Sequence, residues 1–191
     1  MSRRYTELTF TDSVKEAQER YGSRATGKRM EGRSVEDRRL GEHEASFIAA
    51  RDSFYMASVG ENGWPYVQFR GGPAGFLKIL DERTLGYADF RGNRQYISTG
   101  NIDKDDRVAL ILMDYPNRQR LKVMARAEIL EAGGRPELVE RLRDPDYDAK
   151  IERVVLFHVE AFDWNCPQHI TPRYTAEEIE AISRRAGSSD T

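Results

Sequence analysis

The stretch Asp89-Phe-Arg-Gly-Asn-Arg-Gln-Tyr-Ile-Ser-Thr-Gly-Asn101 lies between two apolar segments, residues 84–88 and 108–113, that have the composition of β-strands. It brings arginines, amides and hydroxyls together in one short connection. A guanidinium group presents a fixed fork of donors to phosphate oxygens, and a helix N-terminus adds backbone N–H groups and a partial positive charge. The stretch therefore predicts a site for a phosphate-bearing ligand on a β-rich fold.

On both sides of this stretch, apolar and polar residues alternate with the period of two that is typical of strands. Glu61-Asn62-Gly63 has the composition of a tight hairpin turn, and Asp81-Glu82-Arg83 forms a second turn. Antiparallel strands joined by such hairpins favour a closed or nearly closed barrel, and a β-sandwich is the main alternative. The strands are expected at residues 54–59, 65–70, 76–80, 84–88, 108–113, 121–129 and 154–162.

Helices are expected only at the periphery of this barrel, at residues 12–21, 41–51, 136–142 and 176–185. We divide the chain into a charged N-terminal arm (1–40), the barrel (41–175), and a C-terminal helix with its tail (176–191). Basic residues of the arm alternate with acidic ones. This pattern favours a solvated or subunit-wrapping segment over a nucleic-acid contact.

The composition of the chain argues against some classes of binding partner. Charged residues make up 32% of the 191, yet the formal net charge is only −2, which argues against nucleic acid as a partner. No apolar run is long enough for a transmembrane helix and no secretory signal follows the first residues, so we expect no membrane association. A single cysteine, Cys166, cannot form an internal disulfide, which fits a cytoplasmic location.

Other kinds of chemistry have little support. Gly71-Gly-Pro-Ala-Gly75 precedes a strand and lacks the Lys-Ser/Thr end of a phosphate loop, so it is either a strand bend or a close approach to a flat ligand. Cys166 and His169 are two candidate metal ligands, fewer than a zinc site needs, and we expect no metal. No hydrolase motif is present, and no residue can be assigned as catalytic.

Four segments of the chain form a familiar combination. They are Trp64-Pro-Tyr-Val-Gln-Phe-Arg-Gly-Gly-Pro73, residues 87–101, Arg118-Gln-Arg-Leu-Lys-Val123 and Trp164-Asn-Cys-Pro-Gln-His-Ile-Thr-Pro-Arg173. Together they resemble the pyridoxamine 5′-phosphate oxidase-like, FMN-binding split-barrel family over residues 45–175. The resemblance implies a mainly β fold with peripheral helices, a six-stranded antiparallel split barrel. It also implies a homodimer with two FMN molecules in clefts at the subunit interface.

The resemblance further implies which residues hold the cofactor. The strand that reaches the FMN phosphate and ribityl chain carries Gln68 and Arg70. The strand end along the flavin carries Tyr87, Ala88 and Asp89, and the phosphate cradle consists of Asn93, Arg94, Ser98 and Asn101. Residues near the isoalloxazine ring, contributed in part by the partner subunit, are Gln119, Trp164, Gln168 and Arg173.

The family implies an oxidoreductase that acts on a small molecule, with the flavin carrying the chemistry. Two departures argue against pyridoxamine phosphate as the substrate. Asn93-Arg94 stands where the oxidases of the family carry an Arg-Lys pair, and Pro172-Arg173-Tyr174 stands in place of their terminal Arg-x-His motif. A non-catalytic flavin sensor or carrier on the same scaffold is the alternative, because no substrate-specific acid or base can be identified.

Overall fold

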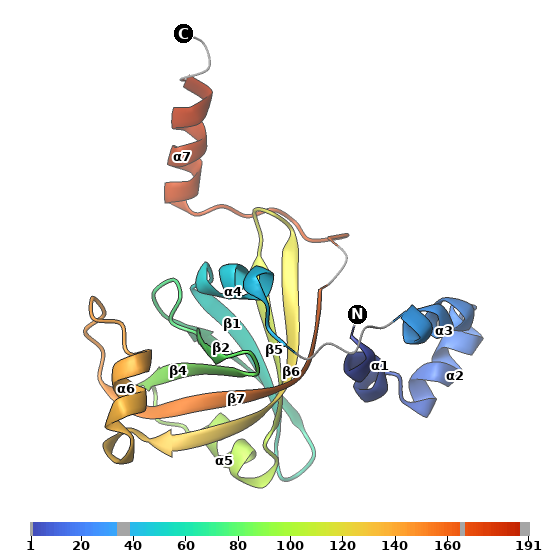
Figure 1. Cartoon of the computed structure of the whole chain (residues 1–191), viewed down its shortest axis with the longest axis horizontal. Coiled ribbons are helices and arrows are strands. Elements are labelled where there is room, and N and C mark those ends of the chain that lie inside the picture. The colour runs from blue at the N-terminus through green and yellow to red at the C-terminus, as the bar shows by residue number, and fades with distance from the viewer. Residues whose placement is uncertain (1, 34–38, 165–166, 188–191) are drawn as a thin grey trace.

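A computed structural model describes residues 2–33, 39–164 and 167–187, and within these ranges the fold is centred on one seven-stranded antiparallel sheet (Figure 1). The strand order across the sheet is β2-β1-β5-β6-β7-β4-β3. The strands are β1 (Ser53–Val59), β2 (Pro65–Gly71), β3 (Lys78–Asp81), β4 (Thr84–Phe90), β5 (Arg107–Asp114), β6 (Gln119–Glu131) and β7 (Ile151–Trp164). Each of the expected strands is therefore present.

The sheet curves into a barrel that does not close. Strand β7, which is 14 residues long, pairs with β6 on one side and with β4 on the other, and register shifts bend both ladders. Strands β2 and β3 form the two edges of the described sheet. The predicted fold class, a mainly β antiparallel split barrel with peripheral helices, is confirmed. The short strand β3 is present in addition to the six strands that the resemblance implied.

The glycine-rich segment between β2 and β3 bends the chain. The N–H of Gly72 donates to the carbonyl oxygen of Asp52, and the N–H of Gly75 donates to that of Arg51, both at 2.9 Å. Gly75 has a left-handed φ of 81°, and a Cβ there would lie 3.1 Å from the carbonyl oxygen of Ala49. Of the two interpretations of this segment, the geometry supports the strand bend.

Helices occupy the periphery of the barrel, as expected. They are α4 (Glu42–Ala49) before β1, α5 (Ile97–Lys104) between β4 and β5, the short η1 (Ala132–Gly134) and α6 (Pro136–Leu142) between β6 and β7, and α7 (Ala176–Gly187) after β7. A capping box begins α7, because the N–H of Glu178 donates to the Thr175 hydroxyl and the N–H of Thr175 donates to the Glu178 carboxylate. In Figure 1, α7 projects away from the barrel.

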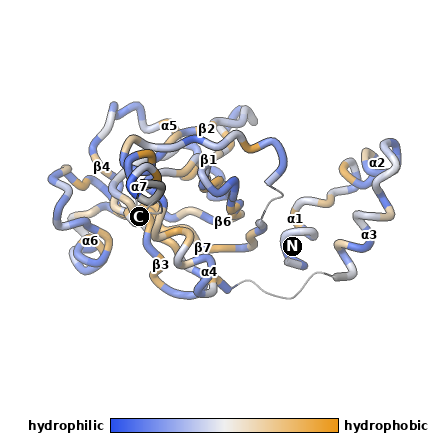
Figure 2. Tube along the Cα trace, turned by 90° about the horizontal axis from the view of Figure 1, so that it is seen from above, coloured by the Kyte–Doolittle hydropathy of each residue, from blue (hydrophilic) through white to orange (hydrophobic). Residues whose placement is uncertain are grey.

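The N-terminal region forms three helices, α1 (Arg3–Thr9), α2 (Asp12–Arg20) and α3 (Arg24–Arg33), of which the sequence predicts only the second. Helix α1 packs on β6 and β7. Arg4 donates to Glu160 at 3.3 Å, and the ammonium of Lys122 lies 5.1 Å from the ring centre of Tyr5. Figure 2 shows α2 and α3 standing beside the barrel. The arm is thus helical and held to the sheet through α1.

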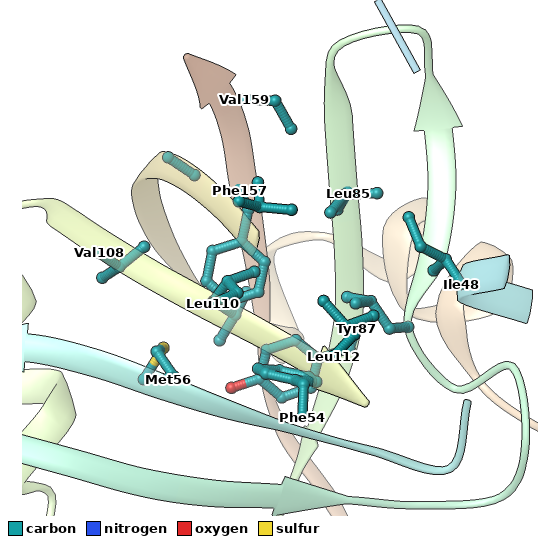
Figure 3. Close-up of a cluster of buried hydrophobic side chains, with 14 of the residues drawn as sticks. Ile48, Phe54, Met56, Leu85, Tyr87, Val108, Leu110, Leu112, Phe157 and Val159 are labelled. Carbon is teal, nitrogen blue, oxygen red and sulfur yellow. The ribbon is translucent and has the colours of Figure 1, made fainter. Parts of the chain in front are cut away.

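The core fills the inside of the curved sheet. Figure 3 shows Phe54 of β1, Tyr87 of β4, Leu110 of β5 and Phe157 of β7 meeting there. The ring of Tyr87 stacks on that of Phe157 at 5.8 Å, and Phe54 meets Phe157 edge to face at 6.0 Å. These contacts fix the strand end around Tyr87, where the predicted cofactor site begins.

Candidate functional site

A pocket of about 280 Å³ opens where β2, β4 and β7 meet the loop after β4 and the first turn of α5. Side chains from segments far apart in the sequence converge on it. Seven of the thirteen predicted site residues line the pocket, namely Gln68, Arg70, Tyr87, Asp89, Asn93, Arg94 and Ser98. The fold therefore brings together the strand and loop groups that the sequence predicted to hold one ligand.

A buried carboxylate organises two arginines in this pocket. Asp89 is 3% exposed, and its Oδ1 accepts a hydrogen bond from Arg70 Nη1 at 3.0 Å. Its Oδ2 accepts two from Arg153, at 3.0 Å from Nε and 2.7 Å from Nη2. Asp89 and Arg153 meet because they are register partners on β4 and β7. Two guanidinium groups share the Asp89 carboxylate, and Arg153 also lies 3.5 Å from the carboxylate of Glu152, which lines the same pocket.

The loop after β4 presents a third arginine. Arg94 Nε donates to the hydroxyl of Tyr96 at 3.3 Å, and the Tyr96 ring centre lies 4.9 Å from Cζ of Arg153. Arg94 and Tyr96 have φ angles of 61° and 54°, a left-handed conformation that non-glycine residues rarely adopt. Tyr96 is also the N-cap residue of α5 and makes no side-chain cap hydrogen bond. The first turn of α5 thus adds backbone donors beside the guanidinium groups.

Three buried polar atoms of pocket-lining residues have no hydrogen-bond partner within the described part of the chain: the Tyr87 hydroxyl, Arg70 Nε and Glu152 Oε2. The first two are donors, and Glu152 Oε2 lies 3.5 Å from Arg153 Nη2. Burial raises the pKa of Tyr87 well above its ordinary value, and the positive charge of Arg70 opposes only part of that shift. The hydroxyl is therefore neutral at physiological pH and can donate a proton in a hydrogen bond. Because buried polar groups are nearly always paired, a ligand with acceptor atoms fits this position.

Two further predicted residues serve the fold near the pocket. The side-chain amide of Asn101 donates to the hydroxyl of Ser58 on β1 at 3.0 Å, which fastens α5 to the sheet. Successive side chains of a strand point to opposite faces, so Ala88 faces away from Tyr87 and joins a second buried cluster with Leu142 of α6. In the single chain, neither side chain lines the pocket.

The remaining four predicted residues, which we call the hairpin group, are Gln119, Trp164, Gln168 and Arg173. Gln119 begins β6, and Cζ of Arg173 lies 5.0 Å from the ring centre of Tyr115 in the turn between β5 and β6. Trp164 ends β7, and its Nε1 donates to Glu44 of α4 at 2.8 Å. Figure 1 shows the chain after β7 passing this turn. None of the four lines the pocket within the described chain.

The pocket-lining residues that were not predicted from the sequence include Tyr96, Glu152 and Arg153. Arg153 owes its place to the register between β4 and β7, which no local pattern reveals. Tyr96 belongs to the stretch 89–101, but an aromatic side chain does not by itself indicate a phosphate-binding site. Its contacts with Arg94 and Arg153 are what connect it with the site.

Other candidate sites are not assembled in the described ranges. No three His, Cys, Asp or Glu side chains of these ranges come together as a metal site would require, and Cys166 lies outside them. His158 Nε2 lies 3.0 Å from Glu128 Oε2 on an exposed part of the sheet. None of the helices described here has the length and apolar character that a bilayer crossing demands.

Comparison with known proteins supports the fold. A putative pyridoxamine 5′-phosphate oxidase from Lactobacillus delbrueckii is 22% identical, with a TM-score of 0.52, and the match covers 68% of this chain and 97% of the other. HupZ from Group A Streptococcus is 14% identical, with a TM-score of 0.51, over 71% of this chain and 99% of its own. No curated protein matches the chain. The family model for pyridoxamine 5′-phosphate oxidase matches residues 40–165, more than half of the chain. On this match, the chain belongs to the pyridoxamine 5′-phosphate oxidase family.

Proposed function

We propose that this protein is an FMN-binding flavoprotein that works as a homodimer and acts as an oxidoreductase on a small molecule. The observation that carries the proposal is one pocket, in a member of this family, that combines three arginines, the N-terminus of α5 and the buried Tyr87 hydroxyl. Arginine forks and helix N-termini suit a phosphate, and a buried O–H suits an acceptor oxygen or nitrogen. FMN carries both kinds of group.

In this proposal, different residues of the pocket bind different parts of the cofactor. Arg94 and the backbone N–H groups of the first turn of α5 hold the phosphate, while Arg70 and Tyr87 donate to acceptor atoms further along the molecule. The Ser98 hydroxyl donates to Gln68 Oε1 at 2.6 Å and so joins α5 to β2. Asp89 has both oxygens engaged by arginines, so it positions them. The flavin, when bound, supplies the redox chemistry, and the protein supplies orientation and a positively charged environment.

The visible absorption spectrum of the purified protein tests the cofactor assignment. We expect flavin bands either in the protein as isolated or after incubation with FMN and removal of the unbound cofactor by gel filtration. The retained amount should approach one FMN for each pocket. A colourless protein that releases all added FMN on the column would refute the proposed function.

An apolar surface that the single chain leaves open supports the homodimer. We call it the outer apolar face, and it consists of Tyr55 of β1, Val67 and Phe69 of β2 and Ile111 of β5, which are between 38% and 61% exposed. The four are neighbours, because Tyr55 pairs with Phe69 on one side and with Ile111 on the other. Contiguous exposed apolar surface of this kind marks an interaction site. A second copy of the chain is the partner that we propose for it.

The outer apolar face continues into the hairpin group. Burial, followed by a hydrogen bond with Tyr55, raises the pKa of Tyr115, and the same Tyr115 ring contacts Arg173. A second copy seated on the face would therefore have the hairpin group at the rim of the interface. In that arrangement Gln119 and Arg173 of one copy would approach the pocket of the other, which gives the hairpin group a role that the single chain does not.

A charge placed in the outer apolar face should prevent dimer formation. We expect the wild type to show twice the 22.0 kDa mass of the single chain by light scattering, and Ile111→Glu to show the single-chain mass, because a buried unpaired carboxylate is unfavourable. Ile111→Ala shortens the same side chain without a charge and should stay dimeric, and circular dichroism checks that both variants fold. A monomeric wild type, or a dimeric Ile111→Glu, contradicts this interface.

A flavin carrier or sensor without turnover is the second candidate function. The described pocket lining favours it in one respect, since it includes no histidine or cysteine that would act as an acid or base near neutral pH. Steady-state oxidation of a reduced nicotinamide in the presence of an electron acceptor separates the two candidates. A rate above that of free FMN supports the oxidoreductase, whereas a protein that retains FMN and adds nothing to this rate supports the carrier.

A further inference from the structure

An unbroken series of side-chain contacts runs from a buried carboxylate to an exposed guanidinium in the pocket. Asp89 receives the two hydrogen bonds of Arg153, whose side chain is only 12% exposed. Arg153 lies over the ring of Tyr96, and the Tyr96 hydroxyl accepts a hydrogen bond from Arg94. The series therefore connects the rigid β4–β7 ladder with the exposed loop that carries Arg94.

Tyr96 matters in this series because it contacts both arginines. A free arginine side chain has many rotamers, and fixing one of them opposes anion binding. A guanidinium that is already held by a neighbour binds the same anion more tightly, because less rotamer freedom is lost on binding. Arg94 is exposed and is held at Nε by the Tyr96 hydroxyl.

The backbone of Tyr96 agrees with such a role. Its φ of 54° is unfavourable for a non-glycine residue, and its side chain makes no capping hydrogen bond to α5 that would account for it. What the conformation achieves is a ring beside Arg153 and a hydroxyl beside Arg94. We infer that Tyr96 is a positioning residue that orders Arg94 on the Arg153–Asp89 anchor. It thereby sets how strongly the pocket prefers a phosphorylated ligand.

This inference rests on the proposed FMN site and concerns only its phosphate end. FMN and riboflavin differ by the phosphate alone, so they separate positioning from general structural support. If Tyr96 acts through Arg94 on the phosphate, then loss of its hydroxyl weakens FMN binding and leaves riboflavin binding unchanged. If the hydroxyl merely supports the loop, both flavins lose affinity together.

The experiment measures dissociation constants of FMN and riboflavin by flavin fluorescence for the wild type, Tyr96→Phe, Arg94→Ala and the double variant. Tyr96→Phe keeps the ring beside Arg153 and removes the acceptor for Arg94. We expect its affinity for FMN to fall about 2- to 10-fold, the effect of losing one preorganised side chain, while its affinity for riboflavin stays the same. In the Arg94→Ala background the same substitution should have a clearly smaller effect, because only the interaction of the hydroxyl with Arg153 remains to be lost. Tyr147→Phe removes a tyrosine hydroxyl outside the pocket lining and is the control.

Three results would overturn the inference. The first is an FMN preference that Tyr96→Phe leaves at the wild-type value, and the second is an equal loss of affinity for both flavins. The third is an effect of Tyr96→Phe that persists undiminished in the Arg94→Ala background. A wild type that binds neither flavin overturns the proposed function as well, so the wild type alone tells the two failures apart.

Discussion

Replacing Asp89 with alanine is expected to destabilise the protein by about 3–5 kcal/mol, because removal of one partner from a buried ion pair leaves uncompensated charge. Here two guanidinium groups, of Arg70 and Arg153, lose the Asp89 carboxylate at once, and their side chains are only 20% and 12% exposed. Arg153 keeps the more distant carboxylate of Glu152, at 3.5 Å. With a urea m-value of about 2–3 kcal/mol/M for a chain of this size, the midpoint of urea unfolding should fall by about 1–2 M. Equilibrium unfolding followed by circular dichroism measures this shift.

An exposed ion pair provides the matched control for Asp89. Glu140 and Arg143 approach to 2.9 Å, but their side chains are 69% and 50% exposed, and such pairs contribute about 0–1 kcal/mol. Glu140→Ala should therefore leave the urea midpoint almost unchanged, and Asp89→Asn, which keeps the shape without the charge, should lie between the two. All variants are compared at one protein concentration, since association would shift the midpoint. Equal midpoints for Asp89→Ala and Glu140→Ala would show that the buried cluster does not hold this end of the sheet.

Replacing Arg94 with alanine is expected to weaken FMN binding about 10- to 100-fold, the effect of losing one charge-assisted contact to a phosphate. The stability of the protein should stay near the wild-type value, because the Arg94 side chain is exposed and its hydrogen bond to Tyr96 is a long one, at 3.3 Å. Alanine is a better choice than glycine here, since glycine would also relax the left-handed backbone. Flavin fluorescence titration measures the dissociation constant.

Arg135 is the matched control for Arg94. It is also an exposed arginine, with a carboxylate of Glu137 4.0 Å away beside α6, and it does not line the pocket. Arg135→Ala removes the same charge from the protein and should leave FMN binding unchanged. Similar dissociation constants for the two variants would mean that the phosphate does not bind at Arg94, and the phosphate end of the pocket would have to be reassigned.

Most of the barrel could be predicted because its signals are local. The turn at Glu61-Asn62-Gly63 closes as expected, with the N–H of Gly60 donating to the carbonyl of Trp64 at 2.9 Å. Strands β5 and β6 alternate between buried and less buried residues with the expected period. Helices α1 and α3 were not predicted, because neither segment has apolar residues at the spacing that is typical of an amphipathic helix. In α1 the burial of Tyr5 comes from packing on the sheet, which is a tertiary effect.

The candidate site could be predicted only in part, for the same physical reason. Arg94 and Ser98 lie in one short stretch whose chemistry is visible in the sequence. The partnership of Asp89 with Arg153 spans 64 positions and depends on strand register, which a single sequence does not reveal. The hairpin group was assigned through the resemblance alone. Within the described chain, none of its four residues lines the pocket, and only the three-dimensional fold reveals this. Its proposed role now depends on a second copy of the chain.

Four aromatic rings meet in the core beside the pocket, and three of them are phenylalanines, Phe54, Phe76 and Phe157. Tyr87 alone among the four adds a hydroxyl, and a buried polar group without a partner costs about 1–3 kcal/mol. A barrel shaped by stability alone would carry a fourth phenylalanine at this position. Tyr87 thus belongs both to the core and to the pocket lining. A ligand that accepts a hydrogen bond from its hydroxyl would therefore stabilise the core of the barrel. The melting temperature of the protein would then rise with the fraction of pockets that hold a ligand.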